Sequence, residues 1–206
     1  MALNTYTALS SAVASWLHRS DLTTIIPDFI TLAERRIYRR LRVREMETIA
    51  TVTSTGTATV SLPSSYLEGK RLFMNGSTKT ELSYIPPEDF YARYMGSTTT
   101  STPEAFTIEG ENLVIGGTPA SGLTFDFLYY KQPAALSTTN HSLFTNNPDV
   151  FLFGSLIEAQ PYLKDEKRFP LWEQRFQQAL QDMEAKDSKD RHSGSVLRIR
   201  TLSQVV

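Results

Sequence analysis

The spacing of apolar residues changes twice along the chain, and this change most constrains the fold. Between Leu22 and Leu41 apolar residues recur at steps of three and four, which predicts an amphipathic helix. From Thr51 to Leu62 β-branched residues alternate around Thr55-Gly56-Thr57, which predicts a β-hairpin. Apolar residues return to helical spacing after Pro148. A helix is predicted to begin there, because proline suits the first turn of a helix. The chain should therefore contain helices, then a β-rich middle, then helices again.

The same patterns predict the remaining elements. Residues 5–18 and 86–94 are predicted helices, and Asn75-Gly76 is a hairpin turn between two short strands. The last helix is predicted to begin at Asp165, and residues 188–194 to form a polar linker. Three further strands are predicted at residues 105–108, 112–115 and 124–130.

The simplest packing of these elements pairs the outer helices with each other. The expected fold class is α+β: an antiparallel helical bundle with an inserted β-rich segment and an extended C-terminal arm. The expected domains are a bundle of residues 1–47 and 140–187, an insertion of residues 48–139, and an arm of residues 188–206. A chain of 206 residues is long enough to bury a core in this way.

Composition excludes several classes of protein. The chain has no cysteine, which excludes disulfides, thiolate metal sites and a cysteine nucleophile. Its net charge of −1 gives the whole chain no electrostatic attraction to nucleic acid. No secretory signal is recognised, and no apolar run reaches the length of about 20 residues that spans a bilayer. No membrane partner is expected.

The residues offer no catalytic, cofactor-binding or metal-binding constellation. His18, His141 and His192 lack a second ligand at metal spacing and are expected at the surface. Gly116-Gly117 lacks the lysine of a phosphate loop, and Ser155 lacks the second glycine of a nucleophile elbow, so Ser155 is interpreted as a residue for close helix packing. The sequence therefore predicts that the protein is not an enzyme and needs no cofactor.

Three carboxylate pairs leave a hydrolase as an alternative. Glu88-Asp89 and Asp165-Glu166 stand at predicted helix starts, where negative charge is favoured. Glu109 and Glu111 flank a predicted turn. A glycosidase-type acid and base would need two such groups gathered in one pocket.

An arginine cluster is the most unusual local feature, and it contains no lysine. On the predicted helix, one face opposite the apolar stripe carries Arg35, Arg39 and Arg42, and a neighbouring face carries Arg36, Arg40 and Arg44. One interpretation is that the arginines lie on the solvent-exposed side of the helix and form internal ion pairs. The other is contact with phosphates, as in a nucleic-acid-binding module, or with acidic patches on partner subunits. The candidate residues are Arg35, Arg36, Arg39, Arg40, Arg42 and Arg44.

The C-terminal tail alternates aliphatic and basic residues after a polar stretch. It is interpreted either as a disordered terminus or as a docking arm that adds to a strand or groove of a partner. The candidate arm residues are Val196, Leu197, Arg198, Ile199, Arg200 and Leu202.

Several segments together resemble the head-to-tail adaptor (connector) proteins of tailed, podovirus-like phages. The resemblance extends from about Tyr6 to Ala185. It consists of helix motifs and their spacing, without a catalytic signature. The segments that carry it are Tyr6–Asp21, Ile25–Ile30, Ala33–Ile37, Leu41–Glu47, Leu62-Pro63 and Pro148–Gly154.

This resemblance implies a structural subunit of a dodecameric ring beneath the portal. The ring would join the portal protein to a tail nozzle or tail protein and surround the channel through which genomic DNA passes without sequence recognition. The tail from Ser195 onward would grip the portal. The protein would be made in the bacterial host cytoplasm and would reside in the virion neck.

Overall fold

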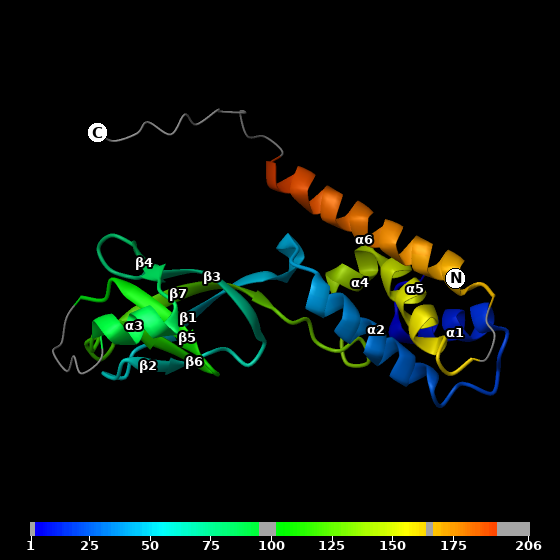
Figure 1. Ribbon diagram of the computed structural model, residues 1–206, viewed down its shortest axis with the longest axis horizontal. Coiled ribbons are helices and arrows are strands. Elements are labelled where there is room, and N and C mark those ends of the chain that lie inside the picture. Colours follow the sequence, from blue (N-terminus) through cyan, green and yellow to red (C-terminus); the bar gives the residue numbers. More distant parts are fainter. Residues whose placement is uncertain (1–2, 95–101, 164–166, 193–206) are drawn as a thin grey trace. The chain divides into compact units, whose positions relative to one another are not determined.

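The computed structural model describes residues 3–94, 102–163 and 167–192 (Figure 1). The chain divides into two compact units. The helical unit comprises Met1–Arg44 and Ala135–Val206, and the sheet unit comprises Glu45–Ala134. The helices of the helical unit are α1 (Tyr6–Leu17), α2 (Ile26–Arg40), α4 (Ser142–Asn146), α5 (Pro148–Ala159) and α6 (Phe169–His192). A 3₁₀ turn, η1 (Arg44–Met46), spans the boundary between the units.

The ends of α1 and α2 follow from their sequences. The Thr5 side chain accepts a hydrogen bond from the Ala8 N–H (3.2 Å) and caps the start of α1. His18 ends α1 in the left-handed conformation, with φ of 53°. α2 begins at Ile26 with Pro27 in its first turn, where the missing N–H costs nothing.

Helix α5 lies at the centre of the helical unit, against α1, α2 and α6 (Figure 1). Gly154 allows this packing, because a Cβ atom there would lie 3.2 Å from the Phe176 ring and 3.3 Å from Ala33 Cβ. Ser155 is fully buried, and its hydroxyl donates to the Phe151 carbonyl (2.7 Å), as suits the predicted close packing. The buried residues of α5 are Val150, Phe151, Leu152, Gly154, Ser155, Leu156, Ile157 and Ala159.

Helix α6 covers α5 with an apolar stripe. Its buried residues are Trp172, Phe176, Ala179, Leu180 and Met183. The helix continues to His192, through residues that the sequence predicted to be a linker. The residues after Met183 are therefore helical without contributing to the apolar core.

The sheet unit contains seven strands in the order β1-β7-β3-β4-β5-β6-β2. The strands form one curled sheet around an apolar core. Its strands are β1 (Glu47–Thr53), β2 (Thr59–Ser61), β3 (Tyr66–Met74), β4 (Thr80–Tyr84), β5 (Ala105–Glu109), β6 (Asn112–Ile115) and β7 (Thr124–Lys131). The core residues are Leu72, Leu82, Phe106, Leu113, Ile115, Phe125, Phe127 and Tyr129.

Helix α3 (Pro87–Tyr94) belongs to the sheet unit. It follows β4 and packs on β5, and these two strands run parallel. A parallel pair needs a crossover connection, and α3 lies in that connection. Phe90 is the buried residue of α3, and Gly116 leaves room for the Tyr94 ring.

The hairpin predicted around Gly56 is wrong, although both of its strands exist. β1 pairs with β7 and β2 pairs with β6, so the two strands lie at opposite edges of the sheet. The connection between them is bonded elsewhere: the Ser54 N–H donates to the Leu123 carbonyl (2.8 Å), and the Gly122 N–H donates to the Ser54 carbonyl (2.9 Å). The hairpin predicted at Asn75-Gly76 is confirmed by the antiparallel pairing of β3 and β4.

The predicted fold class, an antiparallel helical bundle with an inserted β-rich segment and an extended arm, is also wrong. Within the described residues the protein is mixed α and β, with six helices and a seven-stranded curled sheet. The sheet is not an outgrowth of a bundle, because it encloses its own core and carries its own helix α3. The tail residues assigned to the arm, Val196–Arg200 and Leu202, lie outside the described residues.

Candidate interface surfaces

The arginine cluster does not form two faces of one helix. α2 ends at Arg40, and Leu41 is extended with ψ of 138°. Arg42 and Arg44 therefore lie beyond the helix. The Arg42 guanidinium donates back to the Tyr38 and Leu41 carbonyls (3.0 and 2.7 Å) and so stabilises the C-terminal end of α2.

Two arginines of α2 form ion pairs with neighbouring helices of the same unit. Arg36 Nε lies 2.6 Å from Glu158 Oε1 on α5. Arg40 donates to Gln177 Oε1 on α6 (2.6 Å) and lies 3.7 Å from the carboxylate of Glu184. These contacts agree with the internal ion-pair interpretation, and each contributes about 0–1 kcal/mol where it is exposed.

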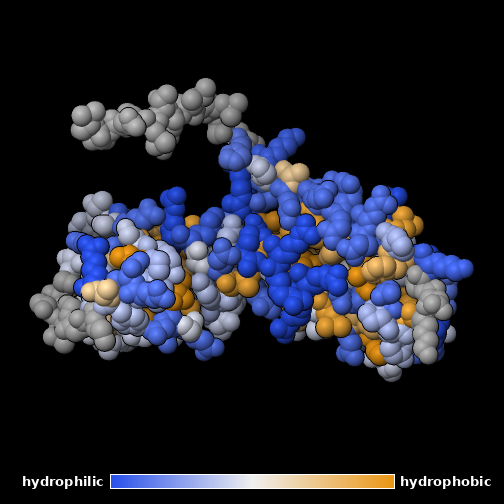
Figure 2. Space-filling view, viewed as in Figure 1, coloured by the Kyte–Doolittle hydropathy of each residue, from blue (hydrophilic) through white to orange (hydrophobic). Residues whose placement is uncertain are grey.

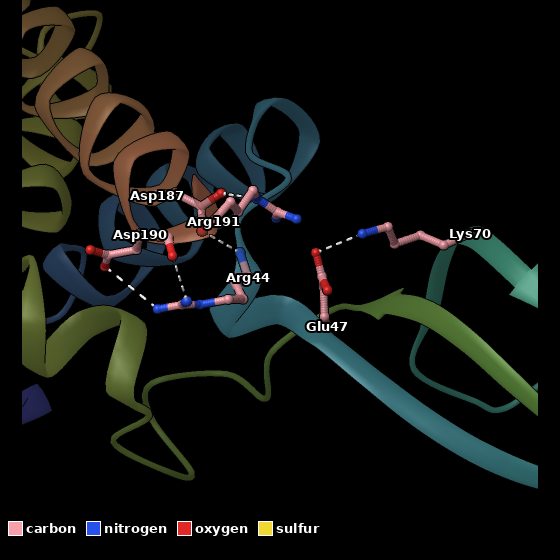
Figure 3. A network of polar contacts seen from close by, with 6 residues as sticks. All are labelled: Arg44, Glu47, Lys70, Asp187, Asp190 and Arg191. Carbon is pink, nitrogen blue, oxygen red and sulfur yellow. Dashed lines mark hydrogen bonds and ion pairs between the residues drawn. The ribbon is translucent and has the colours of Figure 1, made fainter. Parts of the chain in front are cut away.

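Arg44 joins the end of the first helical segment to the C-terminal turns of α6 (Figure 3). Its backbone N–H donates to Asp187 Oδ1 (2.7 Å), and its guanidinium reaches the Asp190 carboxylate (3.5 Å) and carbonyl (3.3 Å). Asp187 also accepts from Arg191 Nε (2.6 Å). We call these four residues the Arg44 network, and it holds the part of α6 that lies beyond the apolar core.

The remaining two arginines are exposed. Within the part of the chain that the structure describes, Arg35 and Arg39 form no ion pair, and Arg39 Nε donates to the Arg35 carbonyl (3.2 Å). Leu32 lies one turn before Arg35 and is 50% exposed. We call Leu32, Arg35 and Arg39 the α2 face. On the side shown in Figure 2, hydrophilic residues gather over the C-terminal half of α2.

A buried polar network, which the sequence reasoning missed, lies behind the α2 face. Glu34 is 4% exposed, and its carboxylate accepts from the Leu136 N–H (2.7 Å) and the Tyr38 hydroxyl (3.4 Å). His141, expected at the surface, is half-buried, with Nε2 2.8 Å from the Tyr38 hydroxyl. Because His141 Nδ1 accepts from the Phe144 N–H (3.3 Å), a neutral ring carries its proton on Nε2 and donates it to Tyr38. The spacing of Glu34 and Tyr38, one turn apart, was the available signal.

Burial raises the pKa of Glu34 above its ordinary value of 4.5. A carboxyl with a higher pKa in the folded state takes up its proton first in the folded state, so lowering the pH through this range favours folding. As the pH falls from 7 toward 4.5, the helical unit of the wild type should therefore gain stability relative to Glu34→Gln, which keeps an oxygen acceptor for Leu136. Urea unfolding followed by fluorescence of Trp16 and Trp172, both in the helical unit, measures this difference.

Asp28→Asn is the matched control, because Asp28 is an exposed carboxylate on the same helix. This variant should show the pH dependence of the wild type. If Glu34→Gln and the wild type kept the same difference in urea midpoint at both pH values, the buried carboxylate would not be titrating as argued.

Polar contacts of the sheet unit hold its strands together. Asp126 on β7 accepts from Thr51 on β1 (2.8 Å), from Asn75 (2.9 Å) and from Lys79 (2.5 Å). These bonds, first that from Lys79, lower the pKa of Asp126 to about 2. Lys70 on β3 lies 2.8 Å from Glu47 on β1 (Figure 3). Asp126 thus connects β7 to β1 and to the β3–β4 turn, and Lys70 and Glu47 connect β3 to β1 across β7, so the role of these groups is structural.

Neither of two grooves in the sheet unit gathers the carboxylate pairs considered for a hydrolase. One groove of the sheet unit is lined by Ser61–Ser64, Tyr66 and Gly110–Asn112, with Glu111 as its carboxylate. A second is lined by Tyr66, Glu68–Lys70, Tyr84, Phe106 and Ile108, with Glu68 as its carboxylate. Each groove thus holds one acid, whereas glycosidase chemistry needs two.

The three pairs lie in different places. Glu88 and Asp89 occupy the first turn of α3, as predicted. Glu109 ends β5, and Glu111 follows the turn at Gly110. Asp165 and Glu166 lie outside the described residues. Among residues 3–94, 102–163 and 167–192, no three His, Asp or Glu side chains are placed to hold a metal ion. None of the helices in these ranges has the length and apolarity to cross a membrane.

The described residues thus form a mixed α and β protein with exposed arginines on one helix and a single acid in each of the two grooves. The chain belongs to the SU10 adaptor protein family, whose model matches residues 4–200. The resemblance to phage head-to-tail adaptors is confirmed at the level of the family. No curated protein matches the chain significantly. Families of structural phage adaptors are not usually enzymatic, and membership implies a place in the virion neck.

Proposed function

We propose that this protein is a head-to-tail adaptor subunit that forms a dodecameric ring between portal and tail around the DNA channel. The observation that carries the proposal is the match to the SU10 adaptor protein family over residues 4–200. The exposed α2 face supports it, because arginines that form no ion pair with the described residues, beside an exposed leucine, suit contact with partner subunits or with passing DNA. The partners are further copies of the chain, the portal protein and a tail or nozzle protein.

Co-assembly with the portal protein of the same phage tests this proposal. The two full-length proteins are expressed together, purified as a complex and imaged by negative-stain electron microscopy. The expected result is a ring of adaptor density on one end of the portal. Portal particles without added density, together with no co-purification of the 23.2 kDa chain, would contradict the proposal. A variant truncated after His192 tests whether the candidate arm is needed for portal binding.

A nucleic-acid-binding role is the second candidate, and it is favoured by the same exposed arginines. Arg36, Arg40 and Arg44 are engaged in ion pairs of the helical unit, which leaves Arg35 and Arg39 for phosphates. DNA affinity would then fall steeply with salt, and Arg35→Ala/Arg39→Ala would reduce the slope of log K against log salt by about 2. An unchanged slope would exclude these arginines as phosphate ligands.

A further inference from the structure

The two units carry opposite net charge. The sheet unit has ten Asp and Glu against five Lys and Arg, which gives −5. The helical unit has 16 Lys and Arg against 12 Asp and Glu, which gives +4. The near-neutral whole chain conceals this asymmetry. Because one unit of each copy attracts the other unit of another copy, the charges favour association of unlike surfaces.

A basic surface available for such association is the α2 face. Arg36 and Arg40 are directed to Glu158 and Glu184 of their own unit. Arg35 and Arg39 are exposed, and Leu32 beside them is half exposed. The α2 face thus offers two guanidinium groups and one apolar side chain to a partner.

A surface with complementary chemistry lies on the sheet unit, where α3 packs on β5. The Tyr91 hydroxyl donates to the Glu109 carboxylate, and Glu88 lies one turn before Tyr91 on α3. All three side chains are exposed, and Tyr91 is 37% exposed. Within the described ranges, neither Glu88 nor Glu109 forms an ion pair. We call Glu88, Tyr91 and Glu109 the α3–β5 patch.

We propose that the α2 face of one copy binds the α3–β5 patch of the next copy, and this inference rests on the proposed ring. A guanidinium group stacks on a tyrosine ring and pairs with carboxylates, which the patch provides together. Leu32 supplies the apolar contact at the centre. Because two different surfaces of the chain meet, the contact is heterologous and repeats from copy to copy until the ring closes. DNA would satisfy the arginines but would leave the acidic patch without a role.

Cysteine cross-linking tests the contact, because the chain contains no cysteine of its own. Arg39→Cys and Glu88→Cys are placed in one chain, assembled with the portal protein and treated with a short bis-maleimide. The expected result is a ladder of covalent oligomers in a denaturing gel. A mixture of the two single variants should give covalent dimers, and each single variant alone should give none.

A matched pair of control cysteines uses exposed positions on the same two units, Gln181→Cys on α6 and Glu81→Cys on β4. This pair should give no ladder. Rings in the micrographs without a ladder from Arg39→Cys/Glu88→Cys would overturn the assigned surfaces while leaving the proposed function standing. A fast-migrating monomer without a ladder would place the contact within one chain and would also overturn the inference. If the wild-type chain also formed no rings with the portal protein, the function and the inference would be rejected together.

Charge reversal gives an independent readout. Arg35→Glu/Arg39→Glu and Glu88→Arg/Glu109→Arg should each lower ring yield about tenfold or more, because like charges then face each other. All four changes in one chain should restore ring yield. If Arg35→Glu/Arg39→Glu left the rings intact and abolished DNA retention instead, the α2 face would be a DNA surface and the inference would be overturned.

Discussion

Replacing Trp172 with alanine is expected to lower the unfolding free energy of the helical unit by about 3–5 kcal/mol. Trp172 is 1% exposed on α6, in the stripe that covers α5. The change removes the largest fully buried side chain and leaves a cavity that rigid helix packing fills poorly. Urea unfolding followed by circular dichroism at the helical band measures the loss.

Leu171→Ala is the matched control, because Leu171 is the neighbouring residue and is 52% exposed. Its effect should stay within about 0.5 kcal/mol of the wild type. If Trp172→Ala cost no more than Leu171→Ala, Trp172 would not lie in the core. Arg168, whose guanidinium lies 5.0 Å from the centre of the Trp172 ring, also loses its aromatic contact in the variant.

A loss of similar size, about 3–5 kcal/mol, is expected when Phe127 is replaced by alanine, and it should affect the sheet unit. Phe127 is fully buried, and its ring stacks on Tyr66 and Tyr129 with centroids 5.8 and 5.4 Å away. A Cβ atom on Gly69 would lie 3.0 Å from the same ring, which shows how closely the core is packed there.

Tryptophan fluorescence makes this second prediction specific, since Trp16 and Trp172 both lie in the helical unit. Phe127→Ala should lower the urea midpoint of the strand signal in circular dichroism. It should leave the urea midpoint of the tryptophan fluorescence unchanged. Ile49→Ala on β1, where the side chain is 64% exposed, is the control and should be near neutral. A fluorescence midpoint that fell together with the strand signal would show that the two units unfold as one.

Local patterns predicted most of the helices but missed α4 and the end of α6. The stripe from Leu22 to Leu41 gave α2, and proline at positions 27, 87 and 148 marked the first turn of α2, α3 and α5. Pattern alone did not reveal which strands pair, because pairing depends on contacts between residues far apart in the chain. β1 pairs with β7 instead of its neighbour β2, since the Ser54–Ala58 connection is bonded to the turn at Gly122.

The sequence predicted the arginine cluster as a group, but it did not predict that its members have different roles. The sequence shows six arginines within ten residues. It does not show their partners, which lie far away in the chain: Glu158 for Arg36, and Asp187 and Asp190 for Arg44. His141 was missed for the same reason, because its partner Tyr38 is far away in the chain. The one-turn spacing of Glu34 and Tyr38 was visible, but it did not show that Glu34 is buried.

The Arg44 network has a mechanical consequence. Arg44 is the last residue of the helical unit before the chain enters the sheet unit, and Asp187 and Asp190 lie near the end of α6. Beyond Met183, side-chain hydrogen bonds and ion pairs, instead of apolar packing, hold α6 against the rest of the helical unit. A pull on the chain beyond His192 therefore loads ion pairs first, and these weaken as ionic strength rises. We therefore expect the end of α6 to detach before the core of the helical unit is strained, and to detach more easily at higher ionic strength.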